Sequence, residues 1–355
     1  FVSSRNNSTQ IYVMPATGGE PKKVSDLEIS PTNLTWSPDG SAIAFSADIS
    51  WPHQPEDKFP TQVKIWDDLF YRHWNEWRAG VRSHIFLLDL KNGEAKDLTP
   101  FDQDYPTLAL GGYRDIAFTP DGQSIAVVAN LDKNRATSTN NDILLIPIQG
   151  GDIVNLTASN PSNDNNPLFS PDGKWMAYRA QLRAGFEADR QRLMLMDWAS
   201  RDVRDLTSDW TLSIGEIVWS PDSRYIYAEV EEEARNVFYR ISIPDGQREK
   251  VVKDGHNKSP RITADGQTIV CLRESAKEPA EIFAIDLAKG SARQVSHVNS
   301  KLIAQLEMNP VEDFWFTGAR GRRIHGLLLK PPAFDPARKY PLVYLVHGGP
   351  QGAMQ

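Results

Sequence analysis

Short apolar runs recur along most of the chain, and polar turns rich in Pro, Asp and Gly separate them. Typical runs are Ser41-Ala-Ile-Ala-Phe, Lys174-Trp-Met-Ala-Tyr and Arg224-Tyr-Ile-Tyr-Ala. Runs of this length, rich in β-branched and aromatic residues and bounded by turn residues, predict strands rather than helices. The chain is therefore expected to consist mainly of short strands joined in hairpins.

A turn of the Ser-Pro-Asp-Gly type marks an internal repeat. It occurs as Trp36-Ser-Pro-Asp-Gly, Phe118-Thr-Pro-Asp-Gly, Phe169-Ser-Pro-Asp-Gly, Trp219-Ser-Pro-Asp-Ser and Ile262-Thr-Ala-Asp-Gly, at spacings of 82, 51, 50 and 43 residues. Pro presets φ for such a turn, and Gly accepts the positive φ that the turn requires. The period is typical of the blades of a β-propeller.

A second hairpin follows each of these turns, so that each repeat predicts one four-stranded blade. Its strands begin at His84, Asp142, Arg192, Asn236 and Glu281, and several copies end in Asp-Leu-Thr or Asn-Leu-Thr. A sixth copy, Gln10-Ile-Tyr-Val-Met, opens the chain without a preceding Ser-Pro-Asp-Gly turn. We therefore predict an all-β propeller over residues 1–300 that lacks its first strands, with six blades visible and seven or eight in the intact ring. An open β-solenoid is disfavoured because its repeats are shorter.

The spacing of 82 residues contains an insertion between Trp51 and Gly80 that is rich in aromatic residues. Four of them have the spacing of one face of a short helix: Trp66, Phe70, Trp74 and Trp77. Such a face more often packs against another domain than binds a ligand. A short helix in a core or an interface is the favoured interpretation.

The repeat stops after Val298, and three strand-like runs follow. They are Glu312-Asp-Phe-Trp-Phe-Thr, Arg323-Ile-His-Gly-Leu-Leu-Leu-Lys and Pro341-Leu-Val-Tyr-Leu-Val, of which the last is almost continuously apolar, as in a strand buried on both faces of a sheet. It leads into His347-Gly-Gly-Pro, and in α/β-hydrolases such a glycine turn supplies half of the oxyanion hole. Residues 301–355 are predicted to begin an α/β-hydrolase domain.

Composition excludes several classes of function. The chain has 355 residues with 39 Lys and Arg against 46 Asp and Glu, a net charge of -7, which argues against nucleic acid as a partner. No apolar run suggests a membrane span. The single cysteine, Cys271, is expected to be a buried small side chain, and His73 and Glu76 lack the further ligands of a metal site. No metal or cofactor is expected.

Three motifs together make the chain resemble the prolyl oligopeptidase family of serine peptidases. They are Asp67-Asp-Leu-Phe-Tyr-Arg-His-Trp-Asn-Glu-Trp, Gly185-Phe-Glu-Ala-Asp-Arg and Tyr340-Pro-Leu-Val-Tyr-Leu-Val-His-Gly-Gly-Pro-Gln-Gly. The resemblance implies a propeller that covers an α/β-hydrolase domain with a Ser-Asp-His triad, and it is strongest to the dipeptidyl peptidases of the family. The chain contains no Gly-x-Ser-x-Gly, so the triad is expected outside it and the chain alone is expected to be inactive.

The resemblance also implies a substrate site, an oligomeric state and a cellular location. His347 takes the position of an oxyanion-hole residue, with Gly348 and Gln351 beside it, and a local turn histidine is the alternative. A peptidase that releases dipeptides from short peptides needs a carboxylate for the free α-ammonium group, and Glu76 and Glu187 are the candidates. Trp74, Trp77 and Phe186 would supply apolar surface beside them. A homodimer through the hydrolase domain, and a periplasmic or secreted location with the cytoplasm as the alternative, follow from the same resemblance.

Other interpretations stay open at this point. Glu76 and Glu187 could instead form salt bridges with Arg72, Arg78, Arg183 or Arg190. Acylaminoacyl-peptidase or oligopeptidase activity would replace the anchoring acid by a pocket for a blocked N-terminus. A non-catalytic, TolB-like propeller would use the same repeats to bind proteins, but it would not need the segment from Tyr340 to Pro350.

Overall fold

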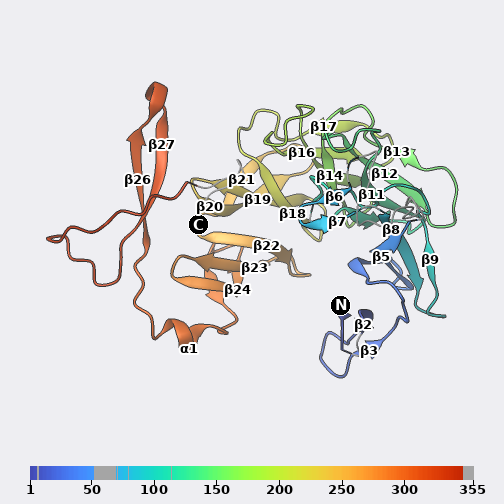
Figure 1. Ribbon diagram of the computed structural model, residues 1–355, viewed down its shortest axis with the longest axis horizontal. Coiled ribbons are helices and arrows are strands. Elements are labelled where there is room, and N and C mark those ends of the chain that lie inside the picture. The colour runs from blue at the N-terminus through green and yellow to red at the C-terminus, as the bar shows by residue number, and fades with distance from the viewer. Residues whose placement is uncertain (6–7, 52–68, 70, 79, 113, 347–355) are drawn as a thin grey trace, which may run out of the picture. The chain divides into compact units, whose positions relative to one another are not determined.

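The computed structural model describes residues 1–5, 8–51, 69, 71–78, 80–112 and 114–346, and nearly all of its regular structure is β (Figure 1). The chain divides into two compact units, residues 1–205 and 206–355, which are described separately.

The first unit consists of antiparallel sheets whose strands follow one another along the chain. A three-stranded sheet, β1-β2-β3, precedes three four-stranded sheets, β4-β5-β8-β9, β10-β11-β12-β13 and β14-β15-β16-β17. The strands are β1 (Val2–Ser3), β2 (Gln10–Val13), β3 (Lys22–Lys23), β4 (Thr32–Trp36), β5 (Ala42–Ser50), β8 (Val81–Asp89), β9 (Ala95–Asp97), β10 (Ile116–Phe118), β11 (Ser124–Asn130), β12 (Asn141–Pro147), β13 (Val154–Asn155), β14 (Asp164–Phe169), β15 (Trp175–Ala180), β16 (Arg192–Asp197) and β17 (Val203–Asp205).

The second unit continues the repeat and then departs from it. Two further meanders are joined by one parallel pairing, Asn236 with His256, and a separate hairpin, β26-β27, follows a short helix. The elements are β18 (Ile214–Trp219), β19 (Tyr225–Glu232), β20 (Arg235–Ser242), β21 (Arg248–Val252), β22 (His256–Ile262), β23 (Thr268–Ser275), β24 (Glu278–Asp286), β25 (Ala292–Gln294), α1 (Ser300–Ile303), β26 (Val311–Thr317), η1 (Ala319–Gly321) and β27 (Arg323–Leu329).

The predicted repeat of two hairpins is confirmed, and so are the strands predicted from Glu312 and Arg323. Each four-stranded meander has the strand order of a propeller blade. The sheets are open, so closure into a ring stays a prediction, as do the domain boundary at residue 300 and the hydrolase fold beyond it.

The buried strand predicted at residues 341–346 is wrong for this structure: the segment forms no strand, and its apolar side chains are 68–79% exposed. Such a run becomes a buried strand only between neighbouring strands, and none pairs with it among the described residues.

The Ser-Pro-Asp-Gly turns owe their residue types to one local network. The Ser37 hydroxyl donates to Asp39 Oδ1 over 2.7 Å, and the backbone N–H groups of Ser41 and Ala42 donate to Asp39 and to the Ser37 hydroxyl. The hydrogen bond from Ser37, with those from Ser41, lowers the pKa of Asp39 to about 2. Equivalent Ser or Thr to Asp hydrogen bonds occur in the other four copies, at Thr119, Ser170, Ser220 and Thr263.

The glycine of a turn can also meet the proline of the preceding turn. Gly173 has φ +72, and a Cβ built on it would lie 3.0 Å from Pro120 Cβ, whereas Gly40 has the same φ and a Cβ on it would meet nothing within 4 Å. We expect Gly40→Ala to cost about 1 kcal/mol for the positive φ alone, and Gly173→Ala to cost about 2–3 kcal/mol because the clash is added. Urea unfolding of the two variants measures the difference. Equal losses would show that this contact between turns contributes nothing.

Leu-Thr endings follow the outer strands of two meanders, β4–β9 and β10–β13. The backbone N–H of Ile85 in β8 donates to the Thr99 hydroxyl over 2.9 Å, and that of Ile143 donates to Thr157 over the same distance. The hydroxyl thus satisfies a buried backbone donor where the outer strand is short. This is the physical reason for the recurring Thr.

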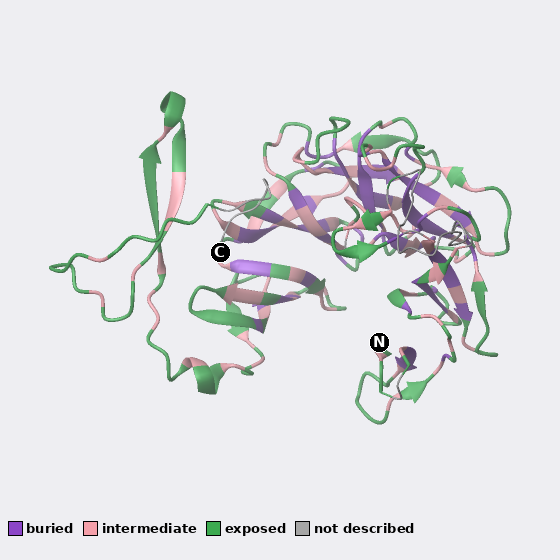
Figure 2. Ribbon diagram, viewed as in Figure 1, coloured by how far each residue is buried: buried purple, intermediate pink, exposed green. Residues whose placement is uncertain are grey.

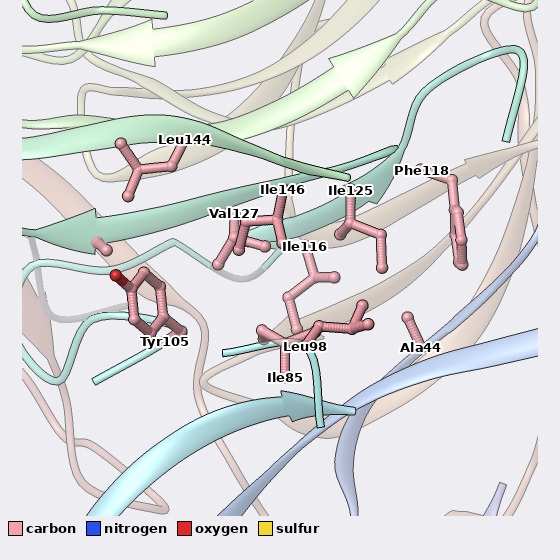
Figure 3. Close-up of a cluster of buried hydrophobic side chains, with 11 residues drawn as sticks. Ala44, Ile85, Leu98, Tyr105, Ile116, Phe118, Ile125, Val127, Leu144 and Ile146 are labelled. Atoms are coloured by element: carbon pink, nitrogen blue, oxygen red, sulfur yellow. The ribbon is translucent and has the colours of Figure 1, made fainter. Parts of the chain in front are cut away.

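The core lies between successive sheets, where purple, buried strand segments face one another (Figure 2). In the first unit, Ala44 and Ile85 of one sheet pack with Ile116, Val127 and Leu144 of the next (Figure 3). In the second unit, Cys271 on β23 is buried as predicted, and burial raises the pKa of its thiol to about 11. An uncharged thiol of this kind behaves as a small hydrophobic side chain.

Candidate functional site

The insertion between β5 and β8 carries a small hairpin where the sequence predicted a helix. The strands β6 (Arg72–His73) and β7 (Glu76–Trp77) pair His73 with Glu76, and Trp74 occupies the turn with φ +51. Arg72 closes the turn by donating to the Trp74 carbonyl over 2.6 Å. The helix prediction is wrong for residues 72–77, because the turn at Trp74 and Asn75 reverses the chain between the two paired strands. Trp66 and Phe70, the other two residues of the predicted helix face, lie outside the described residues.

This hairpin carries one acid, Glu76, and two exposed indoles, those of Trp74 and Trp77. Trp74 is 80% exposed and Trp77 is 56% exposed, so neither is buried by the described residues, as a core or interface helix would require. Glu76 is also exposed, and its carboxylate forms no hydrogen bond or ion pair with any residue that the structure describes. Its two proposed salt-bridge partners bind elsewhere: Arg72 binds Trp74, and Arg78 binds two aspartates. No described residue therefore competes with a ligand for this carboxylate.

Arg78 anchors the base of the hairpin from a buried position. Only 6% of the residue is exposed, its Nη1 atom forms an ion pair with Asp48 of β5, and its Nη2 atom lies 3.3 Å from Asp104 Oδ1. Burial alone would lower the pKa of the guanidinium, but Asp48 and then Asp104 outweigh it and raise this pKa. Arg78 also donates its backbone N–H to the Tyr71 carbonyl over 2.9 Å.

Phe186 and Glu187 lie on the loop between β15 and β16. Asp189 Oδ2 accepts the backbone N–H groups of Leu182 and Arg183, both over 2.8 Å, and thereby shapes this loop. The Arg183 guanidinium lies 3.8 Å from the ring centroid of Phe186, so one side of this 41% exposed ring is covered by a cation. Arg183 also faces Asp189 over 3.7 Å, which fixes its place beside Phe186. Glu187 is exposed.

The two candidate loops are linked through the loop between β11 and β12. In the middle of that loop, Arg135 binds the same Asp104 carboxylate as Arg78, over 3.1 Å. Near the end of the loop, the Thr139 hydroxyl accepts the backbone N–H of Gly185 over 2.8 Å. We call residues 71–78, 101–110, 131–140 and 181–191 the loop rim.

A hollow of about 480 Å³ opens in the loop rim, lined among others by Asp132, Lys133, Thr139 and Gly185.

The sequence analysis placed Glu76 and Glu187 in separate motifs and missed the connecting residues Asp104 and Arg135. No local signal marks these two residues, because their partners are distant in sequence.

The predicted oxyanion-hole residues His347, Gly348 and Gln351 lie outside the described residues, so their role stays a prediction. Within the part of the chain that the structure describes, no group of three or more His, Cys, Asp or Glu residues could hold a metal ion. No helix among the described residues is long and apolar enough to cross a membrane.

Comparison with curated proteins finds relatives that are dipeptidyl peptidases. The chain is 30% identical over 354 residues to dipeptidyl-peptidase 5 of Porphyromonas endodontalis, covering 97% of this chain and 51% of that protein. It is 28% identical to dipeptidyl-peptidase 5 of Porphyromonas gingivalis, covering 91% of this chain and 48% of that protein. The chain thus spans about half the length of the curated relatives it matches. No family model matches the sequence.

Solved structures with a similar fold include an acylaminoacyl peptidase and TolB. Pyrococcus horikoshii acylaminoacyl peptidase aligns with a TM-score of 0.72 at 18% identity, over 96% of this chain and 49% of its own. TolB from Acinetobacter baumannii aligns with a TM-score of 0.53 at 16% identity, over 82% of this chain and 60% of its own. At these identities the likeness concerns the fold alone.

Proposed function

We propose that the full-length protein is a serine peptidase that releases dipeptides from the free N-termini of short peptides. The premise is that this chain belongs to the prolyl oligopeptidase family of peptidases. In this proposal the repeats fold into a propeller that limits access, and residues 301–355 begin the α/β-hydrolase domain. The observation that supports the dipeptidyl specificity is the exposed carboxylate of Glu76, which has no partner among the described residues and lies on a hairpin anchored by Arg78.

The chemistry of the hairpin suits a peptide N-terminus. A carboxylate binds an α-ammonium group through charge-assisted hydrogen bonds, which are roughly twice as strong as neutral ones. The indoles of Trp74 and Trp77 offer apolar surface and π faces that also attract cations. Such an anchor fixes the distance from the N-terminus to the bond that is cleaved, so it selects dipeptides. His347, with Gly348 and Gln351, would stabilise the oxyanion, while the nucleophile and its triad partners would come from the hydrolase domain.

The proposal is tested on the full-length protein with dipeptidyl chromogenic substrates, each prepared with a free and with an acetylated N-terminus. We expect a serine-directed inhibitor to abolish hydrolysis, and only the free N-terminal substrates to be cleaved at a useful rate. Preference for the acetylated substrates would indicate an acylaminoacyl peptidase instead. Absence of hydrolysis in a folded, full-length protein would favour the TolB-like binding module.

A periplasmic or secreted location and a homodimer through the hydrolase domain belong to the same proposal. Cell fractionation followed by immunoblotting tests the location, and light scattering of the full-length protein tests the dimer. Cytoplasmic recovery would contradict the first, and a monomeric mass would contradict the second.

A further inference from the structure

We infer that Arg78 is a positioning residue for Glu76, which it holds at a fixed place in the loop rim through Asp48, Asp104 and Arg135. The inference rests on the proposed function, in which Glu76 binds the substrate's N-terminal amine. Arg78 lies two residues beyond Glu76, so it can act on the substrate through the hairpin that carries Glu76.

The hairpin cannot hold its own position. Each of its strands, β6 and β7, has two residues, and an isolated two-stranded hairpin is at best marginally stable in water. Its indoles stay exposed among the described residues, so the described part of the chain packs little apolar surface against them. The contacts that the described residues make at its base centre on Arg78, which closes the ladder by donating its N–H to the Tyr71 carbonyl.

A buried ion-pair network stands at this base. Arg78 and Asp104 are 6% and 5% exposed, and Arg78 Nε has no hydrogen-bond partner among the described residues. Removing such charges from water costs several kcal/mol, so a buried ion pair is weak evidence for a stabilising role. We therefore assign the network to fixing the position of the hairpin that carries Glu76, rather than to stabilising the fold.

The guanidinium suits this role because its donors point in different directions within one rigid plane. One nitrogen, Nη1, binds Asp48 on β5, while Nη2 reaches Asp104 on the segment after β9. Asp104 is itself fixed, because its Oδ1 atom accepts the Ser83 N–H over 3.0 Å. A lysine ammonium is a point charge on a flexible chain and cannot reproduce this fork.

The same carboxylate extends the connection across the loop rim. Asp104 Oδ2 binds Arg135 over 3.1 Å, so the hairpin and the β11–β12 loop share one anchor. The β11–β12 loop in turn contacts the β15–β16 loop through Thr139 and Gly185. A change at Arg78 or Asp104 should therefore alter the placement of Glu76. It should also lower the stability of the fold because it disturbs a buried ion pair, so the two effects are measured separately.

The test compares Arg78→Lys and the isosteric Asp104→Asn in the full-length protein. We expect each to raise KM for dipeptidyl substrates with free N-termini about tenfold, with kcat changed less than threefold, which corresponds to misplacement of one anchor. Hydrolysis of acetylated substrates should stay the same, so the ratio of free to acetylated hydrolysis should fall. In a Glu76→Gln background, Arg78→Lys should have no further effect on KM, because its effect passes through Glu76.

Arg82→Lys is the matched control. Arg82 lies on the neighbouring strand β8 and pairs with Asp102 over 2.7 Å, outside the hairpin's anchor, so this variant should keep the KM of the wild type. The thermal midpoint of each variant shows whether it is folded. If Glu76→Gln raises KM while Arg78→Lys and Asp104→Asn, both folded, do not, the positioning role is wrong and the proposed function stands. If Glu76→Gln itself has no effect, the proposed anchor is wrong and the inference falls with it.

Discussion

Replacing Glu76 with glutamine is expected to raise KM for substrates with a free N-terminus by about 10–100-fold, since a hydrogen bond to a charged group contributes about 1.5–3 kcal/mol. Glutamine keeps the size of the side chain and removes its charge, so the hairpin should fold unchanged. The residue is exposed and unpaired among the described residues, which leaves little structural cost to confuse the result. Steady-state kinetics with matched free and acetylated dipeptidyl substrates measure the effect.

Glu187→Gln is the matched control for this prediction, because Glu187 is the second exposed candidate on the same loop rim. With Glu76 as the anchor, Glu187→Gln should change the ratio of free to acetylated hydrolysis less than threefold. The opposite result, a large effect of Glu187→Gln and none of Glu76→Gln, would move the anchor to the β15–β16 loop. Loss of activity on both kinds of substrate would instead indicate damage to the fold.

Replacing Asp164 with asparagine is expected to remove a large part of the pH dependence of stability. Asp164 begins β14, is 1% exposed, and accepts a hydrogen bond from Asn160 over 2.9 Å, while its Oδ2 atom has no partner among the described residues. Burial raises the pKa of this carboxyl to about 8, against smaller opposing effects that include the Asn160 hydrogen bond and the charge of Arg192. The side chain is therefore mostly protonated at neutral pH in the folded protein.

The direction of the pH effect follows from this raised pKa. The unfolded chain loses the Asp164 proton near pH 4, whereas the folded protein keeps it up to about pH 8. The contribution to stability is fully present below about pH 4 and is lost as the pH rises through about 8. Between about pH 4 and pH 8, the free energy of unfolding should fall by about 2–5 kcal/mol. The upper end of this range follows from 1.36 kcal/mol for each unit by which the pKa is raised.

Thermal unfolding between pH 5 and pH 9 tests this. The wild type should lose stability relative to Asp164→Asn as the pH rises, because the amide carries no proton to lose. Asp115→Asn is the contrasting variant: the Asp115 carboxylate accepts the N–H groups of Gly112 and Asn166, over 2.6 and 3.1 Å, so an amide there should destabilise the protein at pH 8. Parallel pH profiles for wild type and Asp164→Asn would show that Asp164 is ionised in the folded state.

Most of the fold could be predicted from the sequence, because the signals that build it are local. The Ser37–Asp39 network lies within residues 37–42 of one turn, and the strand after it begins with the apolar run Ala42-Ile-Ala-Phe. Thr99 and Thr157 each bond a backbone N–H 14 residues earlier, within the same sheet. Interactions over such short stretches repeat whenever the sequence repeats, so the period and the strands were both predictable.

Less of the candidate site could be predicted. The sequence indicated which acids stand beside aromatic residues, and Glu76 does lie exposed on the β6–β7 hairpin, with Phe186 and Glu187 exposed on the β15–β16 loop. It gave the wrong element for residues 72–77, because an aromatic spacing of three or four residues fits both a helix face and a tight hairpin. Only the positive φ at Trp74 and the pairing of His73 with Glu76 decide between them.

The sequence by itself determined the repeat, the strands and the turn chemistry, since these depend on residues that are neighbours along the chain. The tertiary structure decided what Arg78 and Asp164 do. Arg78 meets Asp48 and Asp104 across 30 and 26 residues, and Asp164 changes its proton affinity only because the folded sheets remove it from water. Burial and long-range ion pairs are properties of packing, and the same residues in an unfolded chain would be an exposed cation and an ordinary acid.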